Sequence, residues 1–114
     1  MAGNQRMGRR GEDAAAAWYR RRGYRIVARN WRVRAGEIDL ICARGDLVAF
    51  VEVKTRFSDR YGRGVEAVGW RKRQRLRGLA VHWLQTTGGG YDDVRFDVVE
   101  VDGAGRVEVY EGCF

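Results

Sequence analysis

Three charged residues stand near the ends of two apolar segments that are neighbours in the chain. Glu52 and Lys54 follow the apolar run of LVAFVEVKTR, residues 47–56, and Asp39 lies within GEIDLICAR, residues 36–44. If the two segments pair as a hairpin, Asp39 comes to lie beside Glu52. Two adjacent carboxylates repel each other unless a positive charge lies between them. The spacing therefore indicates a site for a hard divalent cation such as Mg²⁺ or Mn²⁺, which prefers oxygen ligands.

A divalent cation at Asp39 and Glu52 would suit the hydrolysis of a phosphodiester. The cation would polarise a phosphoryl oxygen and lower the pKa of a bound water, while Lys54 would orient that water or offset the charge of the transition state. The alternative is a solvated strand end, where the same residues form a cross-strand ion pair that contributes about 0.2–1 kcal/mol. Glu37 shares a strand face with Asp39, although carboxylates two residues apart on a strand often only face solvent.

Basic residues crowd the start of the segment WRKRQRLRGLAVHWLQT, residues 70–86. A helix dipole favours acids at its N-terminus, so basic residues there predict a negative partner nearby. That partner would be the phosphate backbone of a nucleic acid, which such residues contact without recognising the base sequence. The alternative is that these residues form an ordinary solvated face and have no negative partner. The candidates for nucleic-acid contact are Arg71, Lys72, Arg73, Gln74 and Arg75. Trp70 and Tyr61 are aromatic candidates for base stacking, whereas His82 is expected to pack or lie at the surface.

The chain around these residues predicts two helices and four or five strands. The helix at 70–86 has apolar side chains at positions i, i+3, i+4, i+7 and i+8, the pattern of a half-buried helix. Arg44, Gly45 and Asp46 predict a tight turn between two strands, and the polar residues 57–69 predict a loop. The apolar stripe comprises Leu76, Leu79, Ala80, Trp83 and Leu84. The expected elements are a helix at 8–22, strands at 24–34, 36–44 and 47–56, a helix at 70–86, and one or two strands at 91–102 and 106–110.

This order fits a single α/β domain over residues 1–114, with helices packed on a mixed sheet. The helix at 70–86 would form a right-handed crossover to the strand after it. The strand at 47–56 has apolar residues on both faces, which predicts a central position in the sheet. Ligands of open α/β sheets collect outside the carboxyl ends of the strands, and Glu52 and Lys54 lie near that end.

The composition indicates a polyanionic partner. The 114 residues carry 22 Lys and Arg against 15 Asp and Glu, a formal net charge of +7, and this surplus favours nucleic acid, above all DNA, over a small neutral ligand. No apolar run is long enough to span a membrane and the N-terminus lacks the apolar region of a signal peptide, so we expect a cytoplasmic protein without a membrane partner. The spacing of Cys42 and Cys113 predicts neither a zinc site nor a disulfide.

The same residues carry a resemblance to a known superfamily. Asp39, followed by Glu52-Val53-Lys54, resembles the PD-(D/E)xK signature of restriction-endonuclease-like nucleases, with Ile38 at the place of the proline. More closely, the segments GEDAAAAWYRRRGYRIVARNWRVRAGEIDLI, FVEVKTR, YG and RFDVV resemble the YraN family, a bacterial family related to archaeal Holliday-junction resolvases. The resemblance extends from about residue 11 to residue 99.

The resemblance implies a restriction-endonuclease-like fold of helix, three-stranded meander, helix and further strand, with divalent-metal nuclease chemistry. It implies Asp39 and Glu52 as metal ligands, the Val53 carbonyl as a further ligand and Lys54 as a catalytic residue. Glu12 matches the acidic residue that related resolvases bring to the metal site, so it is a candidate for both roles. The alternative for Glu12 is an acid in the first turn of a helix, where the dipole favours it.

Two functions compete at this point. The first is a metal-dependent nuclease that hydrolyses phosphodiester bonds in DNA, including branched DNA such as Holliday junctions. The second is a non-catalytic nucleic-acid-binding module that keeps the nuclease fold. Because branched DNA has two-fold symmetry, cutting two of its strands would favour a homodimer.

Overall fold

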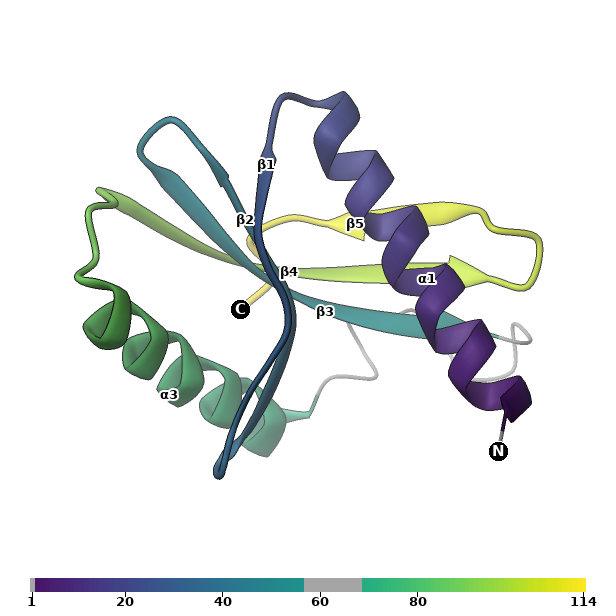
Figure 1. Cartoon of the computed structure of the whole chain (residues 1–114), viewed down its shortest axis with the longest axis horizontal. Coiled ribbons are helices and arrows are strands. Elements are labelled where there is room, and N and C mark those ends of the chain that lie inside the picture. The colour runs from purple at the N-terminus through teal and green to yellow at the C-terminus, as the bar shows by residue number, and fades with distance from the viewer. Residues whose placement is uncertain (1, 57–68) are drawn as a thin grey trace.

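The computed structural model describes the backbone of residues 2–56 and 69–114 and the side chains of residues 9–55 and 69–114. Figure 1 shows a mixed arrangement of helices and strands in these ranges. The elements are α1 (Ala2–Arg21), β1 (Arg25–Val33), β2 (Gly36–Arg44), β3 (Leu47–Arg56), α3 (Trp70–Thr87), β4 (Asp93–Asp102) and β5 (Val107–Tyr110). This order of helix, three strands, helix and two strands confirms the predicted α/β class. The loop predicted at 57–69 lies, except for Gly69, outside the described residues, as does Tyr61.

The strands form one open sheet whose spatial order, β1-β2-β3-β4-β5, is the order of the chain. All neighbours are antiparallel except β3 and β4, which are parallel and have α3 in the connection between them. The turn between β2 and β3 contains two residues, Gly45 and Asp46, and Gly45 has a φ of 57°, which glycine adopts without a steric penalty. The sheet is therefore mixed, and β3 is its central strand, as predicted.

The two helices pack on opposite faces of this sheet. Buried residues of α1 pack with Ala49 and Val51 of β3, whereas buried residues of α3 pack with Val48 and Phe50. Side chains alternate between the faces of a strand, so β3 contributes to both cores. Figure 1 shows α1 and α3 on separate sides of the sheet. Glu52 and Lys54 have the same parity as Phe50 and belong to the face that α3 covers.

The amphipathic pattern of α3 correctly predicts its packing. Of its stripe, Leu76, Leu79, Ala80 and Trp83 are buried, and Leu84 packs partly buried against the same core. Within the part of the chain that the structure describes, no helix combines the length and apolar character needed to cross a membrane.

The first helix is longer than its sequence predicts. It begins at Ala2, not near residue 8, and its glycines at positions 3, 8 and 11 do not end it, because each costs a helix only about 1 kcal/mol. Gly11 lies where α1 approaches β3, since a Cβ at this position would be 2.9 Å from Thr55 Oγ1. The absence of a side chain at residue 11 thus lets the helix lie close to the sheet.

Candidate functional site

The β2–β3 hairpin brings Asp39 and Glu52 together. Leu40 pairs with Val51, and the next residues outward in this antiparallel register are Asp39 and Glu52. The Asp39 carboxylate bends towards β3, where its Oδ2 accepts a hydrogen bond of 2.8 Å from the Val53 backbone N–H. The structure therefore places the two carboxylates side by side on the α3 face, as the sequence predicted.

Both carboxylates line a cavity of about 250 Å³ between the hairpin and α3. Glu37 contributes a third carboxylate to its wall, and Lys72 and Arg75 of α3 face the acids from the other side. Leucine side chains of α3 close the apolar part of the cavity. Charges of both signs thus meet in a small and partly enclosed space.

The electrostatics of Asp39 favour a bound cation. Burial, followed by the charge of the neighbouring Glu52, raises the pKa of Asp39 from 3.8 to about 7, and the hydrogen bond from Val53 only partly opposes this. Glu12 and Glu37 raise the pKa of Asp39 further. Burial and the neighbouring acids therefore disfavour the ionised carboxylate of Asp39, which a positive charge in direct contact would stabilise. A divalent cation at this position would supply that charge.

Glu52 is compensated by two lysines. Only 7% of the residue is exposed, and its Oε1 lies 3.6 Å from Lys54 Nζ and in direct contact with Lys72 Nζ. Burial and the nearby Lys72 lower the pKa of Lys54. Burial also acts to lower the pKa of Lys72, but its hydrogen bond to Glu52 outweighs this and the pKa of Lys72 is raised. The two ammonium groups therefore differ, and Lys54 is the one that releases a proton more readily.

Glu12 is held beside the site from the opposite helix. Its Oε1 accepts a hydrogen bond of 2.9 Å from Asn30 Nδ2 and lies 3.8 Å from Arg29 Nη2, while its charge acts on Asp39. Since α1 begins at Ala2, Glu12 is in the interior of the helix and the first turn contains no acid. The interpretation of Glu12 as a first-turn dipole partner is therefore wrong.

The donor set fits a hard cation that keeps most of its waters. In the described ranges, no three histidine, cysteine, aspartate or glutamate side chains form a ready metal-binding group. Mg²⁺ commonly takes only one or two carboxylates from a protein and completes its octahedron with water and substrate oxygens. Asp39 and Glu52 offer such a pair, and the roles of Glu12 and the Val53 carbonyl as further ligands remain predictions.

The basic residues of α3 do not act as one surface. Lys72 and Arg75 line the cavity, Arg71 and Gln74 are exposed, and the Arg73 guanidinium lies 5.7 Å from the centre of the Phe114 ring. Helical spacing explains this division, because residues three and four apart share a face and immediate neighbours do not. The negative partner that these basic residues predict includes Glu52, through Lys72.

Two aromatic predictions can be placed. Trp70, the first residue of α3, is 72% exposed, which leaves its ring accessible. His82 packs edge-on against Trp31, with ring centres 5.5 Å apart, in keeping with the expected packing role.

Sequence reasoning missed the role of a fully buried carboxylate, Asp97, on the α1 face. Asp97 is fully buried and accepts hydrogen bonds from Tyr19 Oη at 2.7 Å, from two nitrogens of Arg95 at 2.8 Å and from the Gly112 N–H at 2.9 Å. Arg95 also donates to Tyr24 Oη at 2.9 Å. The signals in the sequence were an aspartate inside the apolar run of β4, two residues after an arginine, and the presence of both residues in the family-like segment RFDVV.

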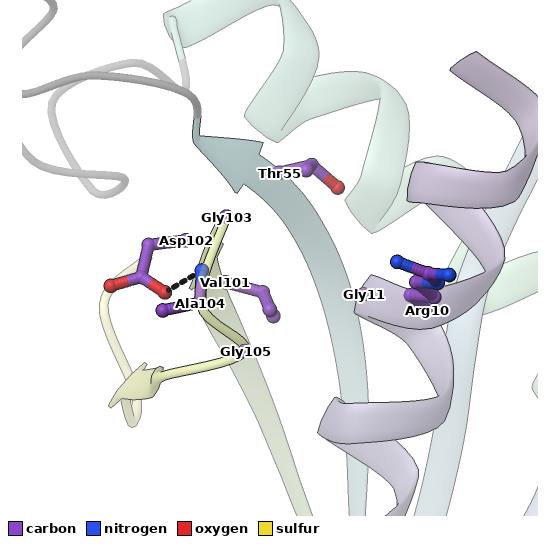
Figure 2. A pocket seen from close by; sticks show the side chains of 8 residues that line it. All are labelled: Arg10, Gly11, Thr55, Val101, Asp102, Gly103, Ala104 and Gly105. Carbon is purple, nitrogen blue, oxygen red and sulfur yellow. Dashed lines mark hydrogen bonds between the residues drawn. The ribbon is translucent and has the colours of Figure 1, made fainter. Parts of the chain in front are cut away.

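A second cavity, of about 190 Å³, lies between α1 and the turn after β4. Figure 2 shows Arg10 and Gly11 on one side, Thr55 at the end of β3, and the turn that begins at Asp102. The Asp102 carboxylate accepts hydrogen bonds from the N–H groups of Ala104 and Arg106, each at 2.9 Å. This acid stabilises its own turn and is not part of the Asp39 and Glu52 pair.

Comparison with known proteins assigns the chain to a family. The family model described as "Uncharacterised protein family UPF0102" matches residues 11–101. The chain belongs to this family. Membership in the YraN family, predicted from the sequence segments, is thereby confirmed. UPF0102 relatives match over most of their length: one from Rhodococcus jostii (strain RHA1) is 52% identical over 89% of this chain and 86% of its own, and one from Parafrankia sp. (strain EAN1pec) is 47% identical over the whole of both chains. A UPF0102 relative from Symbiobacterium thermophilum is 47% identical over 97% of this chain and 98% of its own.

Proposed function

We propose that this UPF0102 protein is a metal-dependent nuclease of the restriction-endonuclease-like superfamily that hydrolyses phosphodiester bonds in DNA, including branched DNA such as Holliday junctions. The observation that carries this proposal is the pair Asp39 and Glu52, which share one cavity with each other and with basic residues of α3. The raised pKa of Asp39 supports it, because burial and the neighbouring acids disfavour the Asp39 carboxylate, which a divalent cation would stabilise.

Asp39 and Glu52 would hold Mg²⁺ or Mn²⁺, with Glu12 and the Val53 carbonyl as further candidates. When bound, such a metal polarises phosphoryl oxygens and acidifies a coordinated water. The Val53 N–H fixes the direction of the Asp39 carboxylate by donating to its Oδ2. Preorganised groups of this kind need no rearrangement during the reaction, which is why they stabilise a transition state effectively.

Lys54 would handle the proton of the attacking water. It lies 3.6 Å from Glu52, and burial and Lys72 lower its pKa, so a neutral amine at Nζ is more accessible than in an ordinary lysine. A neutral Nζ accepts a proton from water, and the resulting ammonium offsets the charge of the phosphoryl oxygens.

The positive charge of the protein would hold the DNA. Arg75 faces the cavity from α3, and Arg71 and Gln74 are exposed on the same helix. With a net charge of +7, the chain would bind phosphates in a salt-dependent manner and without sequence preference. A homodimer with two sites would match the symmetry of a four-way junction, and sedimentation that finds only monomers with and without the junction would count against it.

Cleavage of end-labelled linear, flapped and four-way-junction DNA in Mg²⁺ or Mn²⁺ tests the proposal. Asp39→Ala and Lys54→Ala should each lower the rate by about 10²- to 10³-fold, as expected for the loss of one preorganised group. The matched control is Asp13→Ala, which removes an exposed carboxylate of α1 paired with Arg29 and should leave the rate within about two-fold. Equal rates in Asp39→Ala and wild-type protein would refute the assigned roles.

A second function, a non-catalytic nucleic-acid-binding module, has one observation in its favour. Glu52 already contacts two ammonium groups, so its charge is compensated without a metal. This function predicts DNA binding that needs no metal and survives Glu52→Gln, but weakens when Arg71 and Arg75 are both replaced by glutamate. Binding of this kind without any cleavage would favour the module over the nuclease.

A further inference from the structure

We propose that Lys72 is an internal counter-ion of the candidate metal site, which leaves Glu52 when a divalent cation binds and then contacts a substrate phosphate. This inference rests on the proposed metal binding by Asp39 and Glu52, and it assigns to Lys72 a role distinct from that of the other basic residues of α3. Lys72 would be a positioning residue whose place depends on the occupancy of the site.

The contacts of Glu52 Oε1 show why the metal and Lys72 compete. Lys72 Nζ contacts this oxygen directly, whereas Lys54 Nζ stands 3.6 Å away. Magnesium binds its oxygen ligands at about 2.0–2.1 Å. Two cations on one carboxylate oxygen repel each other strongly in a partly enclosed cavity, so the ion that binds Glu52 displaces the Lys72 ammonium.

The Lys72 ammonium can move away from Glu52. Its side chain is 37% exposed, and it extends from the first turn of α3, so the ammonium can move towards solvent by rotation of its flexible stem. Arg75 lines the same cavity and, three residues further along the helix, shares a face with Lys72. A displaced Lys72 would therefore stay close to Arg75 and to the carboxylates, where a phosphate of the substrate would lie.

This exchange couples metal binding to DNA binding. The metal releases Lys72 for the phosphate, and a phosphate that holds Lys72 removes the competitor from Glu52. Coupling of this kind is reciprocal, so the metal should raise DNA affinity by the same factor by which DNA raises metal affinity. A lysine held permanently on Glu52 would give no such coupling.

Titration with Mn²⁺, followed by the electron paramagnetic resonance signal of the free ion, tests the competition directly. Lys72→Met should bind Mn²⁺ about ten-fold more tightly than wild type, because no ammonium has to be displaced. Arg75→Met is the matched control, since Arg75 faces the same cavity but makes no ion pair with Glu52; its loss should change the affinity by no more than about three-fold. Equal affinities in Lys72→Met and Arg75→Met, or no Mn²⁺ binding in any of the proteins, would overturn the inference.

A second titration tests the coupling to DNA. Lys54→Met is the background, because it would cut slowly while keeping both carboxylates. In this background a four-way junction should raise Mn²⁺ affinity by about ten-fold, and adding Lys72→Met should reduce that factor to about two or less. An unchanged factor would overturn the transfer to phosphate. Mn²⁺ binding and coupling as expected, but without cleavage by the wild-type protein, would refute the nuclease and leave this inference standing.

Discussion

The two faces of the sheet each bury acidic side chains, and they compensate the charge in opposite ways. On the α1 face, Asp97 receives a fork of hydrogen bonds from Arg95 and another from Tyr19. On the α3 face, Asp39 has a hydrogen bond from one backbone N–H and faces the charge of Glu52. The first arrangement contains matched charges, whereas the second contains an excess of negative charge around Asp39.

The two ways of compensating a buried acid suit different roles, one in stabilising the fold and the other in binding a ligand. A buried acid whose oxygens are all satisfied holds its neighbours in one geometry and has no capacity left for a ligand. An acid with a pKa near neutrality beside a cavity can exchange a proton for a cation under cellular conditions. The Asp97 cluster therefore serves the fold, whereas the Asp39 and Glu52 pair, in the function proposed above, would bind a ligand at some expense of stability.

The largest effect on stability should come from Asp97→Ala. The substitution removes the two hydrogen-bonded oxygens of Asp97 from the Arg95 guanidinium, whose side chain is only 19% exposed, and leaves it the more distant Glu111 carboxylate at 3.7 Å. We therefore expect the free energy of unfolding to fall by about 3 kcal/mol. Urea denaturation followed by circular dichroism measures this. Asp93→Ala, at the exposed start of the same strand, should change the value by no more than about 0.5 kcal/mol. If the two variants lose similar amounts of unfolding free energy, the Asp97 cluster does not have the stabilising role that distinguishes it from the Asp39 and Glu52 pair.

The pH dependence of stability should reveal the excess charge at Asp39. The pKa of Asp39 is about 7 in the folded protein, whereas an ordinary aspartate has a pKa of 3.8. The folded state therefore binds the proton more tightly than the unfolded state. The free energy of unfolding should therefore fall by a few kcal/mol at most as the pH rises from about 4 to 7, and it should then level off. Urea midpoints at pH 5 and pH 8 measure the fall.

Two variants assign this pH effect to one residue. Asp39→Asn should remove most of the fall and should be more stable than wild type at pH 8 without metal. Glu37→Gln removes a smaller contribution to the Asp39 pKa and should keep most of the fall. A wild-type protein that gains stability between pH 5 and pH 8 would contradict the raised pKa of Asp39.

The smallest effect should come from Tyr19→Phe. It removes one hydrogen bond to Asp97 but leaves Arg95 and the Gly112 N–H in place, so the free energy of unfolding should fall by about 1 kcal/mol. Tyr91→Phe is the control, because its hydroxyl accepts a long, exposed hydrogen bond of 3.4 Å from Arg25. The same denaturation experiment resolves the two variants, and a larger loss in Tyr91→Phe would be unexpected.

Local periodicity made most of the fold predictable. The alternation in β3, the two-residue turn at Gly45 and the stripe of α3 all depend on residues close in sequence, and each matches the structure. The pairing of Asp39 with Glu52 followed from the same turn, because a short hairpin loop fixes the register. Only the start of α1 was wrong, because the polar and glycine-containing residues 2–7 continue the helix instead of preceding it.

Contacts between distant segments could not be predicted in this way. The Lys72 contact depends on how α3 is rotated over the sheet, and the Asp97 cluster joins α1, β4 and the residues after β5. Neither arrangement has a short-range period in the sequence. The general expectation of a negative partner for the basic start of α3 was sound, but its identity as Glu52 required the tertiary structure.

The two-residue turn between β2 and β3 also has a consequence for the order of folding events. Hairpins with short loops close in about 1–10 μs, whereas the parallel pairing of β3 with β4 must bridge all of α3 and its connections, and distant pairings form more slowly. The acids of the candidate site therefore meet early, and the lysine that neutralises one of them arrives later. Pulse-labelled hydrogen exchange can follow the two stages separately. In the interval between them Lys54, which belongs to the hairpin itself, stands near Glu52 without Lys72, so we expect the two carboxylates to carry less compensating charge than they do in the folded protein.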